Sequence, residues 1–136
     1  MKNRAIIVDI DGTLAIMKDR SPFAWHKVGE DTVNEAVKMI VNAYTGIVII
    51  FSGRDSICRL ETIQWLKENE IKYDALYMRE QRNFEKDSII KERMYNEHIK
   101  DKYDIDFILD DRLQVCRMWY SLGLPLLRVG DPDADF

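Results

Sequence analysis

The sequence predicts an α/β fold in which about five short parallel strands form one sheet flanked by helices. Short apolar runs rich in β-branched residues alternate with longer amphipathic segments along most of the chain. Runs that are apolar on both faces are typical of strands in a parallel sheet, because the connecting helices cover both faces of such a sheet. A chain of 136 residues is close to the usual size of one domain, so we expect a single domain, 1–136.

The individual elements follow from these runs. The clearest helix has apolar side chains at helical spacing from Val33 to Tyr44, with Asp31 as the expected N-cap and Gly46 as the expected stop. Weaker helical patterns cover 56–69, 87–99 and 112–122. The predicted strands cover 4–9, 47–51, 75–78, 106–109 and 126–129.

Composition excludes several classes of protein. The net charge is −4, so the chain has no general attraction to nucleic acid or to an anionic membrane, and any polyanion must be bound locally. No apolar run reaches the length of a membrane span, and the four-residue run before Asp9 is too short for a signal peptide. Cys58 and Cys116 are far apart and are expected to be reduced packing residues. We therefore expect a cytoplasmic protein without a membrane partner.

Polar residues follow four of the predicted strands. They are Asp9 and Asp11, then Ser52-Gly53-Arg54, then residues 79–86, then Asp110-Asp111. Open parallel sheets bind ligands beyond the carboxyl ends of their strands, so these residues are expected to share one edge. Each cluster alone has a simpler explanation as a turn, a helix cap or a solvated helix end. Their joint occurrence favours a functional site.

These motifs carry a family resemblance. The order DxDGT, a strand ending in Ser, a Lys, and a strand ending in Asp-Asp resembles the four motifs of the haloacid dehalogenase (HAD) superfamily, most of whose members are Mg-dependent phosphatases. The stretches DIDGTLAIM, SGR, REQ, EKDSIIKE and DDRLQVCRMW are more particularly similar to the 3'-phosphatase domain of phage polynucleotide kinase-phosphatases. The resemblance implies a Rossmann-like HAD fold and, for a phage-encoded protein, a location in the host cytoplasm.

The first motif can carry covalent catalysis. Asp9 can attack phosphorus and form an aspartyl-phosphate, which splits one difficult hydrolysis into two easier steps. Asp11 can protonate the leaving oxygen and then deprotonate the attacking water. Gly12 allows a tight turn close to the phosphate, and Thr13 is expected to orient Asp11 and to help bind substrate.

Two carboxylates beside a phosphate repel one another unless a cation binds between them. Carboxylate oxygens are hard ligands, which favour Mg²⁺. Asp110 is the expected direct ligand. The resemblance implies a side-chain oxygen from Asp9 and a backbone carbonyl from Asp11, and Asp111 is expected to bind the ion directly or through water.

Further residues are expected to hold the phosphate. Ser52 can donate a hydrogen bond to it, and Lys86 can offset the charge of both Asp9 and the phosphoryl group. Arg20 and Arg54 can bind phosphate in a bidentate manner. The phage family pattern has an acidic residue near the motif lysine where this chain has Asn83, so the role of that acid is open.

The short connections between the predicted strands indicate which size of substrate the site can accept. Many superfamily members carry a cap domain after the first motif or before the third, but residues 14–30 and 79–85 are too short for one. An uncovered site suits a polymer end, and Phe23, Trp25 and Phe84 can stack on bases, although packing is the commoner role of such residues. The kinase loop GxxxxGK[ST] does not occur, so we expect a phosphatase without the kinase.

Three functions remain at this point. The first is a polynucleotide 3'-phosphatase acting on DNA or RNA ends in nucleic acid repair. The second is a HAD phosphatase for a small phosphorylated metabolite or nucleotide, which the missing cap argues against. The third is a non-enzymatic phosphoacceptor of the receiver type, which would lack the second acid of the DxD motif.

Overall fold

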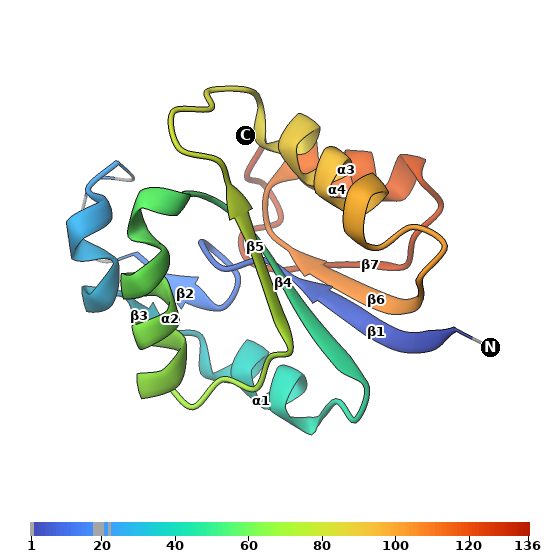
Figure 1. The fold of residues 1–136 in the computed structure, drawn as a ribbon, viewed down its shortest axis with the longest axis horizontal. Helices are drawn as coiled ribbons and strands as arrows, with labels where there is room; N and C mark the ends of the chain where they lie inside the picture. The colour runs from blue at the N-terminus through green and yellow to red at the C-terminus, as the bar shows by residue number, and fades with distance from the viewer. Residues whose placement is uncertain (1, 18–20, 22) are drawn as a thin grey trace.

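The computed structural model describes residues 2–17, 21 and 23–136, and in this part of the chain one parallel sheet organises the fold (Figure 1). Its five strands lie in the order β5-β4-β1-β6-β7, and all neighbouring pairs are parallel. The predicted α/β class and the five predicted strands are therefore confirmed. The strands are β1 (Asn3–Val8), β4 (Ile47–Asp55), β5 (Ala75–Arg79), β6 (Tyr103–Asp110) and β7 (Leu126–Arg128).

Helices cover both faces of the sheet (Figure 1). One face carries α1 (Glu35–Ala43) and α2 (Arg59–Glu68), and the other carries α3 (Asp87–His98) and α4 (Leu113–Ser121). No helix in the described ranges is long and apolar enough to span a membrane.

The start of α1 differs from the prediction. The side chain of Asn34, rather than that of Asp31, caps this helix by accepting a hydrogen bond from the backbone N–H of Val37. Asp31 is buried and its carboxylate binds Arg54 instead. The predicted cap was wrong because a buried ion pair uses the carboxylate that the pattern assigned to the helix end.

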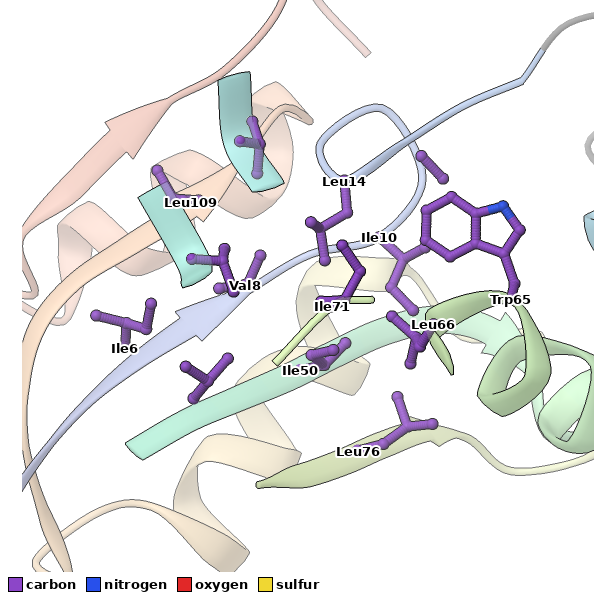
Figure 2. Close-up of a cluster of buried hydrophobic side chains, with 14 residues drawn as sticks. Ile6, Val8, Ile10, Leu14, Ile50, Trp65, Leu66, Ile71, Leu76 and Leu109 are labelled. Carbon is purple, nitrogen blue, oxygen red and sulfur yellow. The ribbon is translucent and has the colours of Figure 1, made fainter. Parts of the chain in front are cut away.

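The core consists of two apolar layers, one on each side of the sheet. Alternate residues of β1 point to opposite faces, so Ile6 and Val8 pack toward α1 and α2, while Ala5 and Ile7 pack toward α3 and α4. Figure 2 shows the first layer, in which side chains from several strands meet those of α2. Its labelled members are Ile6, Val8, Ile10, Leu14, Ile50, Trp65, Leu66, Ile71, Leu76 and Leu109.

The segment after the DxD motif folds back over α2. Its described part contains β2 (Ala15–Ile16), the 3-10 helix η1 (Trp25–Glu30) and β3 (Thr32–Val33), and β2 pairs with β3 in antiparallel fashion. The indole N–H of Trp65 donates to the backbone carbonyl of Asp31 at 2.8 Å and so ties this segment to α2. The segment is too small for a cap domain, as predicted.

Candidate active site

The carboxyl ends of the central strands converge on one cavity of about 650 Å³. Asp9 directly follows β1, and Asp110 is the last residue of neighbouring β6. Strand β4 continues past its predicted end at residue 51, so Ser52 and Arg54 belong to the strand. Residues that line the cavity include Asp9, Asp11, Gly12, Arg54, Arg79, Asp87, Asp111 and Arg112.

A buried lysine joins the two strand-end aspartates. The Lys91 ammonium donates to Asp9 Oδ1 at 2.8 Å and to Asp110 Oδ2 at 3.0 Å, and all three residues are buried. Burial alone lowers the pKa of Lys91, but Asp110 and Asp9 outweigh it and raise the pKa well above its ordinary value, so the ammonium stays charged. Burial raises the pKa of Asp9, and the charge of Lys91 opposes this rise. The lysine therefore holds the carboxylates together inside the fold.

Lys91 occupies the position that we expected for Lys86. Lys86 precedes the first turn of α3 and its side chain is exposed at the rim of the cavity, so it does not lie beside Asp9 as predicted. Lys91 lies on the buried face of α3 with Ile90 and Met94. A lysine within the apolar stripe of a helix was the signal in the sequence that could have identified it.

Asn83 provides no acid near the lysine, but Asp87 lies one helical turn before Lys91 and its charge acts on the ammonium. Its carboxylate binds Arg79 Nη2 at 3.2 Å and Arg112 Nη1 at 3.5 Å. It also lies against Gly53, where a Cβ atom would be only 1.9 Å from Asp87 Oδ1. Sequence reasoning did not single out Asp87, because it placed the functional lysine at Lys86 instead of Lys91.

Arg54 does not have the free guanidinium that we expected of a phosphate-binding residue. It is buried and binds both carboxylate oxygens of Asp11 through Nε at 3.1 Å, with Nη2 also 2.8 Å from Asp11 Oδ1. Nη2 also binds Asp31 at 2.9 Å, and Nη1 donates to Thr62 Oγ1 at 3.0 Å. The structure thus makes Arg54 an anchor for Asp11. The other expected arginine, Arg20, lies outside the described residues.

The two predicted hydroxyl groups differ in what they contact. Thr13 Oγ1 donates to Asp9 Oδ2 at 2.9 Å, so it orients Asp9 rather than Asp11 as we expected. Ser52 is buried, and its hydroxyl accepts a hydrogen bond from the backbone N–H of Arg54 at 3.1 Å. Ser52 therefore lies within β4 rather than after it, and it is not among the residues that line the cavity.

Gly12 is required both by its backbone and by the space around it. Its φ is +84°, a region that favours glycine, and a Cβ atom there would be 2.0 Å from Asp111 Oδ2. We expect Gly12→Ala to lower the free energy of unfolding by about 1–2 kcal/mol and turnover by about tenfold or more, because Asp111 must move. Gly29→Ala is the matched control, since nothing lies within 4 Å of its added Cβ. Equal behaviour of the two variants in urea unfolding and turnover would contradict this account.

Three carboxylates at the cavity can hold a cation. Asp9, Asp110 and Asp111 each offer one oxygen, and these oxygens all lie within 4.8 Å of one another. Burial raises the pKa of Asp111, and the neighbouring charge of Asp110 adds to this effect. A set of oxygen ligands with partly buried negative charge fits a hard divalent cation. The side chain of Asp11 is turned away to Arg54, which leaves only its backbone carbonyl for the expected role.

Exposed aromatic rings surround the cavity. Phe23 and Phe84 are 81% and 91% exposed, and both line it, so they do not serve as core residues. Phe23 packs edge to face with Trp25, with the ring centroids 6.4 Å apart. Sequence reasoning did not single out Phe136, which the C-terminal segment brings to the same rim, near the start of α3 in Figure 1.

The fold and this strand-end arrangement define a phosphatase domain of the HAD type. Residues 3–136 match the family model for the polynucleotide kinase PNKP phosphatase domain. The chain belongs to this family, so the recognition made from its motifs is confirmed.

Two chains of known structure and one viral protein agree with this assignment. A chain in a solved Pnkp1/Rnl/Hen1 complex is 38% identical, with a TM-score of 0.92 over 96% of this chain and 47% of that one. A chain in a Pnkp1/Rnl/Hen1 RNA repair complex is 36% identical, with a TM-score of 0.93 over 98% and 44% of the two chains. A protein of Autographa californica nuclear polyhedrosis virus, described as a bifunctional polynucleotide kinase/RNA ligase, is 34% identical over 90% of this chain and 18% of its own length. The chain thus spans less than half the length of each relative.

Proposed function

We propose that this protein is a Mg²⁺-dependent polynucleotide 3'-phosphatase that heals nucleic acid ends through an aspartyl-phosphate on Asp9. The observation that carries the proposal is the placement of Asp9. This carboxylate lies on the wall of a cavity without a cap domain, between Lys91 and Thr13, and exposed aromatic rings form the rim. The family match supports phosphatase chemistry, and the relatives from repair complexes support a nucleic acid substrate.

The proposed reaction has two steps. Asp9 attacks phosphorus, the new O–P bond forms as the bond to the 3' oxygen breaks, and Asp11 donates its proton to that oxygen. The Asp11 carboxylate then takes a proton from water, which attacks the aspartyl-phosphate and releases inorganic phosphate. Both residues return to their starting states, so the reaction consumes one water per phosphate.

The residues around Asp9 provide charge and orientation. Lys91 and Thr13 fix the Asp9 carboxylate, and Lys91 also offsets negative charge that develops beside it. Ser52 in the second half of β4 is proposed to donate to a phosphate oxygen, and Arg20 is proposed to bind the phosphate. Mg²⁺ bound by Asp9, Asp110 and Asp111 would supply positive charge against the phosphate dianion.

The rim favours a polymer over a small metabolite. Phe23 and Phe84 expose large apolar rings at the cavity, and stacking of bases on such rings stabilises single strands by about 1–3 kcal/mol per base. Lys86 and Arg112 line the same cavity and can attract backbone phosphates. The description of one solved relative as part of an RNA repair complex favours RNA ends as the substrate.

A comparison of phosphate release from matched substrates tests the proposal. The panel contains 3'-phosphorylated RNA and DNA oligonucleotides, 5'-phosphorylated oligonucleotides, a 3'-mononucleotide and a sugar phosphate. We expect the highest kcat/KM for the 3'-phosphorylated oligonucleotides. A higher value for the mononucleotide or the sugar phosphate would instead identify a small-molecule phosphatase.

Metal dependence follows from the carboxylate cluster. We expect exhaustive chelation to abolish phosphate release and Mg²⁺ to restore it, whereas Ca²⁺ should support it poorly because its larger shell is looser. Asp111→Asn should raise the Mg²⁺ concentration for half-maximal activity by about tenfold to a hundredfold, as expected for lost metal affinity. Full activity after chelation, measured with the purified protein, would remove the metal assignment.

A further inference from the structure

The orientation of Asp11 depends on Arg54 and on the residues that hold Arg54 in place. Its carboxylate is held by Arg54, and a guanidinium orients a carboxylate only if its own plane is fixed. Arg54 is buried, so its remaining N–H groups must find acceptors inside the protein. Besides Asp11, its hydrogen-bond acceptors are the carboxylate of Asp31 and the hydroxyl of Thr62.

Thr62 is fully buried in α2. Asp11 lines the cavity, whereas Thr62 does not. Its Oγ1 accepts from Arg54 Nη1 at 3.0 Å and lies 3.6 Å from Cys58 Sγ. The Cys58 thiol donates its single proton to the Asp55 carbonyl at 3.2 Å, so the Thr62 hydroxyl can donate to the sulfur. This arrangement leaves the lone pairs of Oγ1 for Arg54.

We infer that Thr62 is a positioning residue for the acid–base step, acting on Asp11 through Arg54. The hydroxyl of Thr62 fixes one corner of the guanidinium, and the guanidinium fixes the Asp11 carboxylate. Thr62 lies in a helix that the motifs do not include, and it contacts neither the carboxylate cluster nor the cavity. The inference rests on the proposed function, because it assumes that Asp11 exchanges the proton with the leaving group and with water.

Two esters that differ in whether the leaving group needs a proton distinguish this positioning role of Thr62 from a general role in folding. An alkoxide, such as the 3' oxygen of a nucleotide, needs a proton as it leaves, whereas nitrophenolate is stable enough to leave without one. A displaced Asp11 therefore slows transfer of phosphate to Asp9 from a 3'-phosphorylated oligonucleotide but not from p-nitrophenyl phosphate. Damage to the fold slows both transfers to the same extent.

The experiment measures the first turnover of both esters by rapid quench. We expect Thr62→Val, which keeps the shape but removes the hydroxyl, to slow phosphoryl transfer from the oligonucleotide about tenfold. Transfer from p-nitrophenyl phosphate should stay within about twofold, and KM for the oligonucleotide should be retained. Thr62→Ser should restore most of the rate, and Thr45→Val at an exposed position serves as the control.

The outcomes are distinguishable. Equal slowing of both esters by Thr62→Val, or an unchanged rate for both, overturns the inference while leaving the proposed function intact. If Thr62→Val does not fold, Thr62→Ala removes the hydroxyl in its place and is compared with Thr62→Ser on both esters. A wild-type protein that cleaves p-nitrophenyl phosphate but not the oligonucleotide overturns the proposed function, whatever the Thr62 variants do.

Discussion

Asp9→Asn is expected to lower turnover by about 10⁴-fold or more and to leave the fold intact. The amide oxygen is a poor nucleophile, and no other described residue places a carboxylate between Lys91 and Thr13. The fold should persist because Lys91 keeps its contact with Asp110 at 3.0 Å, so the buried ammonium retains a partner.

The measurement combines steady-state phosphate release with thermal unfolding. Asp104→Asn is the matched control, because Asp104 is an exposed residue near the start of β6, at the opposite end of the strand from Asp110. Near-normal turnover of Asp9→Asn with any phosphate ester would exclude Asp9 as the nucleophile.

Lys91→Met is expected to have the second largest effect, on stability and on activity together. Its removal leaves Asp9 and Asp110 as buried carboxylates without their counter-charge. Breaking a buried ion pair in this way lowers the free energy of unfolding by about 3–5 kcal/mol. Turnover should fall by about 10³-fold, because Asp9 loses its fixed orientation and the phosphate loses a nearby cation.

The pH dependence of this loss has a definite sign. Without Lys91, burial and the charge of Asp110 raise the pKa of Asp9 above its value in the unfolded chain, and no ammonium opposes the rise. The folded state then binds this proton more tightly than the unfolded state, so the stability of Lys91→Met falls as the pH rises through the raised pKa of Asp9. The defect should therefore shrink on acidification, and Mg²⁺ at neutral pH should also reduce it.

Lys86→Met is the matched control for this prediction. Lys86 is exposed at the rim of the cavity, so its loss should change the free energy of unfolding by less than about 0.5 kcal/mol. Its effect on turnover should also be much smaller than that of Lys91→Met. If Lys86→Met were the more damaging variant in urea unfolding and phosphate release, the assignment of Lys91 would be wrong.

Sequence reasoning predicted the sheet well, because the pattern that marks each strand lies within a few consecutive residues. Each strand is a short apolar run, and strands buried on both faces need such runs. The residues at their carboxyl ends meet because parallel strands end at one edge, so the pairing of Asp9 with Asp110 followed from the topology.

The errors concern contacts between segments that are distant in sequence. Contacts of Arg54 with Asp31 and Thr62 form only when η1 and α2 pack together. The residues next to Arg54 in the sequence therefore gave no sign that its guanidinium is buried and hydrogen-bonded. The choice between Lys86 and Lys91 depended on which lysine faces the sheet. Helical periodicity could have decided it, because Lys91 shares a face with Ile90 and Met94.

We propose that phosphate from a nucleic acid 3' end is transferred to Asp9 before water releases it. The most direct test mixes the protein and Mg²⁺ with an oligonucleotide that carries a labelled 3'-phosphate, and quenches the reaction in acid within the first turnover. We expect label on the protein that is stable to acid and released by hydroxylamine, located at Asp9 by peptide mass spectrometry and absent from Asp9→Asn. A matched 5'-phosphorylated oligonucleotide should leave the protein unlabelled. Label on another residue would exclude Asp9 as the phosphate acceptor. Phosphate release with no labelled protein at any quench time would exclude a covalent intermediate.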